Sequence, residues 1–432
     1  MSAGICIMNK NAVALAADSA VTIGNHAAIH NSANKLFALS KYEPVGAIVY
    51  ANAEFMRVPV EIIIKEYKRH LGRTNLRELK DYVDSFIEYL QTNIDLFHFA
   101  SNEQNYVNSI FINLLNGLKN GYDNLIQSKV EEVQRELTEE ELSQIASEAF
   151  DETISFIDQQ PVNSTASFSD YIKTNYYNSI IGYITSKFPW IDESHRETLG
   201  NKICVLYDRH FYRNGYVGIS IAGYGKMDIF PRMFHLHLGG IINGKLRYAL
   251  CENVSITENN PASINPFAQT DVMQTFLFGI NDSFIQDMSA EIPKQINKKI
   301  KELDDSIFAT GKKDVVQQQL SGATPTIIQQ IAIKANQRYM QPILQSVATL
   351  PIEEMALLAE SLINITSLRR KVALDGNIGT VGGPIDVAII SKGDGLVWMK
   401  RKHYFDLSHN LQYAVAKYSE IQDSAIGENN NE

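Results

Sequence analysis

The chain has 432 residues, 45% of them hydrophobic and 20% charged, and its formal net charge is −10. A chain of this length can bury a large core without disulfides or metals, and its acidic balance argues against nucleic acid or an anionic membrane as a partner of the whole surface. No apolar stretch reaches the roughly 20 residues of a membrane span, and the N-terminal segment lacks a secretory signal pattern. Cys6, Cys204 and Cys251 show no CxxC spacing, so we expect a reduced, cytoplasmic protein.

Short apolar runs separated by turns predict β-strands in the first fifty residues. These runs are Gly4–Met8, Ala12–Ala17, Lys35–Leu39 and Val45–Tyr50. Consecutive strands with short connections favour antiparallel hairpins over βαβ units.

Helical spacing of apolar residues begins near Glu54 and continues to about Leu199, with a capping box at Thr138 and Glu141. Strand-like runs return at Ile203–Tyr207, Val217–Gly225, Phe234–Leu238 and Leu246–Leu250. A second helix-rich block extends from Phe276 to Arg370, with a helix entry at Leu350-Pro351, and the last strands are Asp386–Ile390 and Leu396–Met399. This order predicts stacked sheets with helical layers outside them.

We therefore expect six segments along the chain. They are an N-terminal part of the sandwich (1–57), an expanded helical insertion (58–202), central strands (203–285), a second helical layer (286–371), closing strands (372–409) and a polar tail (410–432).

One acid and one base stand beside consecutive apolar runs. Asp18 follows the run Ala12–Ala17, and Lys35 opens the run that contains Phe37 and Leu39. A charged group on an apolar face is costly unless it is paired, so pairing these two residues is the economical interpretation. The alternative is that both side chains lie at strand ends in water.

Ser2 follows Met1, and a small second residue is the context in which the initiator methionine is removed. The resulting free α-amine would have a pKa of about 7.7–8.0, which suits a general base, and it would share its residue with the hydroxyl nucleophile. A nearby Lys35 cation would keep that amine neutral, with Asp18 orienting the lysine. The alternative is that Ser2 is an ordinary second residue.

From Ser2 to about Glu54 the chain resembles proteasome β-type subunits of the N-terminal-nucleophile hydrolase superfamily. The segment Val13–Gly24 is similar to the family's LAAD…T-x-G stretch, and Lys35–Leu39 fits its K-I/L-F-x-L strand. The family's nucleophile stands sixteen residues before the aspartate, and 18 minus 2 places it at Ser2. A looser match covers Thr380–Val387, which resembles the family's SGG-x-x-(V/I) stretch, followed by a closing hairpin at Gly393–Gly395.

Several positions depart from the family pattern. The nucleophile is Ser rather than Thr, and Lys35 lies one residue further from Asp18, which requires an insertion between Gly24 and Asn34. Tyr50-Ala51-Asn52 replaces the Gly-Gly whose backbone N–H helps form the oxyanion hole. Ile378 and Val381 stand where supporting Asp and Ser residues would fall, and Pro266–Thr270 replaces a Gly-Ser-rich stretch.

The resemblance implies an α+β fold, a four-layer αββα sandwich of antiparallel sheets, with expanded helical layers. It implies amide hydrolysis of peptides or unfolded protein by Ser2, with Asp18 and Lys35 as further catalytic residues and no cofactor. It also implies assembly into a homo-oligomeric ring or multi-subunit particle, with an ATP-driven unfoldase as a possible partner. Two alternatives stay open: a catalytically inactive scaffold subunit, and an amidase that acts on a small molecule.

Three further signals have simpler explanations than a second active site. His235 and His237 share one strand face, a spacing that a metal can use, but no third ligand is evident and a solvated or hydrogen-bonded face is the better interpretation. Cys6 lies in an apolar strand and is expected in the core. The basic clusters Arg369–Lys371 and Lys400–His403 are expected to be solvated or subunit-pairing patches.

Overall fold

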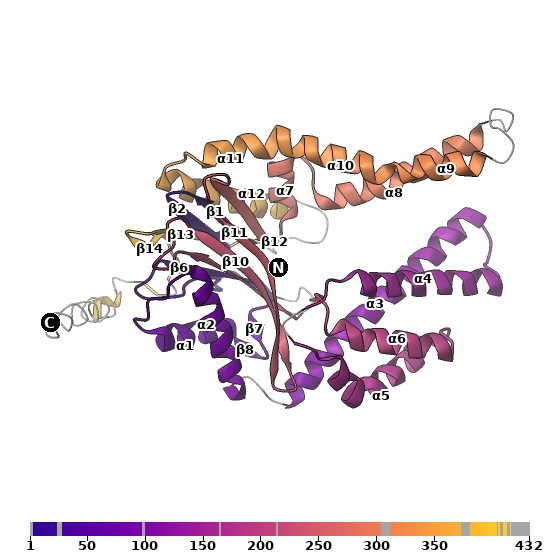
Figure 1. Cartoon of the computed structure of the whole chain (residues 1–432), viewed down its shortest axis with the longest axis horizontal. Helices are drawn as coiled ribbons and strands as arrows, with labels where there is room; N and C mark the ends of the chain where they lie inside the picture. Colours follow the sequence, from indigo (N-terminus) through magenta and orange to yellow (C-terminus); the bar gives the residue numbers. More distant parts are fainter. Residues whose placement is uncertain are drawn as a thin grey trace.

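The computed structural model describes residues 3–23, 28–96, 100–163, 166–212, 215–303, 312–372 and 381–403, together with residues 405, 406, 409–412 and 415. Two five-stranded antiparallel sheets are stacked face to face, and helices cover the outer face of each (Figure 1). The structure confirms the predicted α+β fold with αββα layers.

The first sheet has the strand order β12-β1-β2-β13-β14. Its strands are β1 (Ala3–Asn9), β2 (Ala12–Ala17), β12 (Ala262–Ala268), β13 (Asp386–Ser391) and β14 (Gly395–Lys400). Every residue of β1, β2 and β13 is buried, because the alternating side chains of these central strands pack on a helix layer on one side and on the second sheet on the other.

The second sheet has the order β11-β10-β9-β6-β5. Its strands are β5 (Leu36–Ala38), β6 (Val45–Ala51), β9 (Val217–Gly223), β10 (Arg232–Ile242) and β11 (Lys245–Ser255). A core of residues from both sheets, including Leu15 and Ile48, fills the space between them. Two short hairpins complete the strands: β3 (Val21–Ile23) with β4 (Ala28–His30), and β7 (Glu54–Phe55) with β8 (Val58–Pro59).

The outer layers are formed by amphipathic helices. On the second sheet lie α1 (Val60–Leu71) and α2 (Leu79–Thr92), which bury Ile64, Tyr67 and Phe86 against it. On the first sheet lie α7 (Asp271–Phe278), α11 (Gln341–Val347) and α12 (Ile352–Val372).

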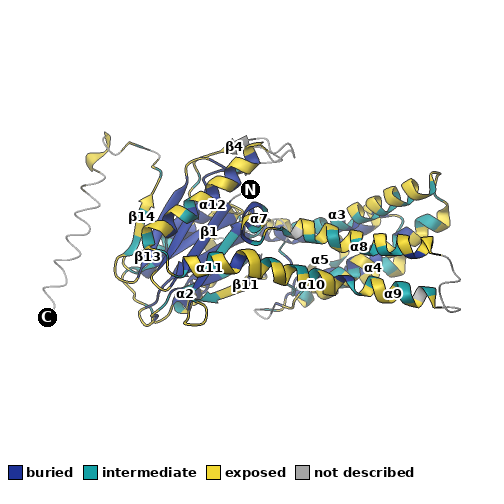
Figure 2. Cartoon of the chain, turned by 90° about the horizontal axis from the view of Figure 1, so that it is seen from above, coloured by how far each residue is buried: buried dark blue, intermediate teal, exposed yellow. Residues whose placement is uncertain are grey.

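The remaining helices form two arms that extend from the same side of the sandwich (Figures 1 and 2). The first arm follows the short 3-10 segment η1 (Ile94–Leu96) and contains α3 (Ala100–Val133), α4 (Glu139–Gln159), α5 (Ser169–Lys187) and α6 (Glu193–Leu206). It has its own hydrophobic core, so it is more than an expanded layer. The second arm contains α8 (Asp282–Glu302), α9 (Lys313–Gly322), α10 (Thr324–Ala335) and the π-helical segment η3 (Asn336–Met340).

A buried arginine ties the first arm to the second sheet. Arg247 of β11 is 0% exposed, and its guanidinium donates to the backbone oxygens of Tyr207, Arg209 and Phe211 and to the hydroxyl of Tyr106. The guanidinium also lies 4.4 Å from the ring centroid of Tyr212, so hydrogen bonds and a cation–π contact hold this buried cation.

The sequence prediction was wrong at several places in the fold. The hairpins β3–β4 and β7–β8 were not predicted, and β7–β8 lies where helical spacing was expected to begin. Ile203–Tyr207 is not a strand, because Leu199, Ile203 and Leu206 continue the buried face of α6. The strand β12 was not predicted, because it contains Pro266 and four further polar or small residues; its edge position tolerates the proline. The capping box at Thr138 and Glu141 is confirmed, with both reciprocal hydrogen bonds present. Among the described residues, no helix is long and apolar enough to cross a membrane.

Candidate active site

Asp18 and Lys35 form an ion pair between the two sheets, as the economical interpretation predicted. Asp18 directly follows β2 and Lys35 directly precedes β5, and Lys35 Nζ lies 2.6 Å from Asp18 Oδ1. The two residues are 1% and 5% exposed, so the alternative of two solvated strand ends is wrong.

The Asp18 carboxylate is saturated with hydrogen bonds. Oδ1 accepts from Lys35 Nζ and from the backbone N–H of Ala3 at 2.9 Å, while Oδ2 accepts from the backbone N–H groups of Ala20 and Gly382 at 3.2 and 3.1 Å. Four donors on two oxygens fix the orientation of the carboxylate. The backbone donors of Ala20 and Gly382 could not be assigned from sequence, although the Gly382-Gly383 pair marked the segment.

Lys35 is held from a second side by the backbone oxygen of Ala20, 2.5 Å from Nζ. Burial lowers the pKa of Lys35 below its usual value of 10.5, and the negative charge of Asp18 opposes that effect. The positive charge of Lys402 lowers this pKa further. Burial therefore disfavours the charged form of Lys35, and the ion pair with Asp18 offsets part of that effect.

Ser2 and Met1 lie outside the described residues, so the proposed nucleophile has no described geometry. The residue that follows Ser2 in the sequence is described. Ala3 opens β1, its N–H donates to Asp18, and its backbone oxygen accepts from the N–H of Asp18 at 3.1 Å. The peptide that follows Ser2 is therefore anchored on the acid of the Asp18–Lys35 pair.

A cavity of about 170 Å³ adjoins Lys35. Its lining is mostly apolar and includes Val21, Ala33, Phe37, Val49, Tyr50, Ala51, Ala53 and Val60. Ala51 has φ of +66°, a left-handed conformation that usually requires glycine. Ala51 thus keeps the backbone conformation that glycine favours, at the position where the family pattern has Gly-Gly.

The other departures from the family pattern have mixed outcomes. Val381 is buried in the core of the α12 layer, and the next residue, Gly382, supplies the N–H to Asp18. Ile378 lies outside the described residues. Pro266–Thr270 spans the end of β12 and the start of α7, where Gln269 accepts a hydrogen bond from Arg370. The β3–β4 hairpin occupies the interval that lengthens the spacing between Asp18 and Lys35.

His235 and His237 point toward the hydroxyl of Tyr50, which contacts both Nε2 atoms. Burial lowers the pKa of each imidazole to about 4, so both are neutral near pH 7. Among the described residues, no cluster of three or more His, Cys, Asp or Glu side chains could hold a metal ion. The contacts with Tyr50 agree with the hydrogen-bonded strand face that the sequence predicted. Cys6 is in the core as expected, and burial raises the pKa of its thiol.

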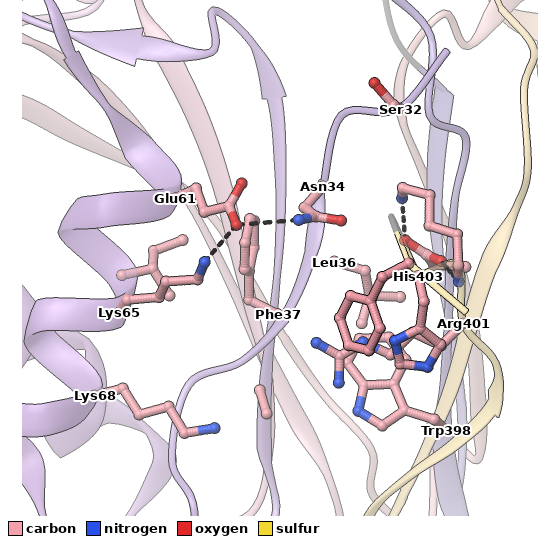
Figure 3. A pocket seen from close by; sticks show the side chains of 15 residues that line it. Ser32, Asn34, Leu36, Phe37, Glu61, Lys65, Lys68, Trp398, Arg401 and His403 are labelled. Carbon is pink, nitrogen blue, oxygen red and sulfur yellow. Dashed lines mark hydrogen bonds and ion pairs between the residues drawn. The ribbon is translucent and has the colours of Figure 1, made fainter. Parts of the chain in front are cut away.

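A larger cavity, of about 550 Å³, lies between α1 and the end of β14 (Figure 3). It shares Asn34, Phe37 and Glu61 with the cavity beside Lys35, so the two cavities are neighbours. The amide of Asn34 donates to Glu61 across this shared lining at 3.0 Å.

The structure thus places a buried acid–lysine pair between the two sheets of an αββα sandwich. No family model and no curated protein matches the sequence. Among solved structures, the chain is similar to an Anbu (Gly-1) mutant from Hyphomicrobium sp. strain MC1, with a TM-score of 0.27, 9% identity, and coverage of 98% of this chain and 97% of that one. It is similar also to Anbu (ancestral beta-subunit) from Yersinia bercovieri, with a TM-score of 0.26, 10% identity, and coverage of 97% of this chain and 96% of that one. A third similar structure, the helical assembly of the Anbu complex from Pseudomonas aeruginosa, has a TM-score of 0.29, 9% identity, and coverage of 97% of this chain and 96% of that one.

Proposed function

We propose that this protein is a proteasome-like amide hydrolase whose nucleophile is Ser2 once the bond between Met1 and Ser2 has been cut. The observation that carries the proposal is the anchoring of Ala3 on Asp18, which itself holds Lys35. Burying a lysine and an acid carries a free-energy cost of desolvation. Lys35 and the N–H of Ala3 bind the same oxygen, Asp18 Oδ1, so a catalytic role for Lys35 next to Ser2 would explain why the pair is buried here.

In this mechanism the Ser2 hydroxyl attacks the carbonyl carbon of the substrate amide and the α-amine of Ser2 takes its proton. The tetrahedral oxyanion collapses, the C–N bond breaks, and the leaving amine receives the proton from the α-amine. Water, activated by the same amine, then hydrolyses the acyl-enzyme. Lys35 keeps the α-amine neutral by like-charge repulsion, and Asp18 holds Lys35 in place.

The cavity beside Lys35 supports a peptide substrate rather than a highly charged small molecule. Its walls of Val21, Phe37, Val49 and Val60 would bury an apolar side chain next to the reacting carbonyl. Unfolded chains present such side chains and folded proteins bury them. We further propose that the chain acts within a homo-oligomeric ring or multi-subunit particle, fed by an ATP-driven unfoldase.

The proposal is tested by intact mass and N-terminal sequencing, followed by hydrolysis of internally quenched peptides. We expect a mature chain that begins at Ser2 and hydrolysis that Ser2→Ala abolishes and Ser2→Thr retains. The matched control is Ser101→Ala, an exposed serine of α3 that should leave the rate unchanged.

Retention of Met1 in an assembled, inactive protein would overturn the proposal in favour of a scaffold subunit. Hydrolysis of small amides, with peptides and unfolded protein left intact, would overturn the substrate assignment and favour a small-molecule amidase.

A further inference from the structure

The 550 Å³ cavity is lined by positive charge from two separate parts of the fold. Lys65 and Lys68 of α1 face Arg401 and His403, which follow β14, across the opening (Figure 3). Four lysine and arginine side chains and two carboxylates line it, an excess of two positive charges in a chain whose formal net charge is −10. Such a concentration favours an anionic ligand.

Both carboxylates of the lining are already neutralised. Glu61 lies 2.6 Å from Lys65 Nζ, and Asp386 is paired with Lys402, whose backbone N–H also donates to it at 2.8 Å. Although partial burial acts in the opposite direction, hydrogen bonds from Lys65 and Asn34 lower the pKa of Glu61, so this group is ionised near pH 7.

Arg401 is ordered without a carboxylate partner among the described residues. Its guanidinium lies 4.4 Å from the ring centroid of Trp398, and both residues line the cavity. Stacking fixes the plane of a guanidinium but leaves its N–H edge able to bind a carboxylate with two parallel hydrogen bonds. Arg401 is therefore positioned to bind a carboxylate that enters the cavity.

The floor of the cavity is the edge of a sheet. Leu36, Phe37 and Ala38, the whole of β5, all line it, although consecutive side chains of a strand point to opposite faces. The cavity therefore lies along the strand edge itself, and β5 is the last strand of its sheet in the described part of the chain. An extended peptide can pair with such an edge through its backbone.

We infer that this cavity binds the carboxylate of an extended peptide, which pairs with β5 and reaches Arg401. The inference deepens the proposed function, because the shared lining of Asn34, Phe37 and Glu61 would let one peptide occupy both cavities. The carboxylate can come from an acidic side chain or from the C-terminus of the peptide. Substrates with a carboxylate a few residues from the scissile bond are then preferred.

The test measures binding of fluorescein-labelled, otherwise uncharged octapeptides to the assembled Ser2→Ala protein by anisotropy. One Glu is moved along the peptide and compared with Gln at the same position, and each peptide is made with a free and an amidated C-terminus. A charge-assisted pair should strengthen binding about tenfold for one position of Glu or for the free C-terminus.

Arg401→Gln should remove that tenfold preference, because Arg401 is exposed and its loss leaves the core untouched. The matched control is Lys400→Gln, which removes the same charge one residue away and outside the cavity. Equal affinity of all Glu, Gln, acid and amide peptides would overturn the inference, as would an equal loss in the Lys400 variant.

Hydrolysis of the same peptides by the unsubstituted protein separates the two proposals. Carboxylate-dependent binding that Arg401→Gln abolishes supports the inference even if no peptide is cleaved, in which case only the proposed hydrolysis fails. Cleavage with no carboxylate preference in binding supports the hydrolysis and overturns the carboxylate site.

Discussion

Replacing Asp18 by Asn tests the central ion pair, because it removes the charge and leaves the size unchanged. Asp18 is 1% exposed and its two oxygens accept four hydrogen bonds, of which an amide can reproduce only part. Removing one partner of a buried ion pair costs about 3–5 kcal/mol, so we expect a loss of that size in the free energy of unfolding.

The pH dependence of that loss identifies its cause. In the wild type, the charge of Asp18 partly offsets the effect of burial on Lys35, and the variant lacks this offset, so the pKa of Lys35 falls further. A lysine whose folded pKa is below its unfolded value of about 10.4 destabilises the fold at low pH and progressively less as pH rises. The gap in the free energy of unfolding between variant and wild type should therefore narrow as pH rises from neutral toward the unfolded pKa of lysine, about 10.4.

Denaturant unfolding of Asp18→Asn, Lys35→Met and the double variant across this pH range provides the measurement. The double variant should lose less than the sum of the single losses, because neither charge is then left alone. An Asp18→Asn protein as stable as the wild type, or a gap that does not change with pH, would refute the buried-pair argument.

Two further predictions concern Tyr50 and the residues around it, His235, His237 and Gly218. Burial lowers the pKa of His235 and His237 to about 4, so the stability that depends on the neutral imidazoles is fully present above about pH 6.5 and is lost as pH falls toward 4. The loss is up to about 3 kcal/mol for each imidazole. In thermal melts, the melting temperature of His237→Gln should therefore fall less steeply with acid than that of the wild type, and an equally steep fall would contradict this. A Cβ added at Gly218 would lie 2.1 Å from the ring of Tyr50, so Gly218→Ala should cost about 1–3 kcal/mol in chemical unfolding. Gly121→Ala, with open space around a helical glycine, is the control and should gain about 0.5–1 kcal/mol; equal effects would contradict the packing argument.

The sheets were predictable where strands are short, apolar and joined by tight turns. β1, β2, β6 and β13 were predicted to within a residue or two, because their side chains are buried on both faces and no competing period occurs. The prediction of a strand at Ile203–Tyr207 was wrong because this run is compatible with two periods. A short apolar run fits either period, and only packing within the first arm selects the helix.

The acid and the lysine of the site were predictable because a charge beside an apolar run requires a partner. The donors that complete Asp18 were not, since a backbone N–H carries no signature in the sequence. The basic cluster Lys400–His403 was visible, but its apposition to α1 depends on how the edges of the two sheets meet, which local sequence does not encode.

The two arms are connected to different sheets of the sandwich. The first arm is inserted between α2, which packs on the second sheet, and β9 of that sheet, whereas the second arm lies between α7 and α11, which pack on the first sheet. Since α3 alone, with 34 residues, is about 50 Å long, a rotation of a few degrees of one sheet against the other displaces the arm tips by several ångströms. The distance between fluorophores on the two arm tips would therefore change more for such a rotation than distances around Lys35 would.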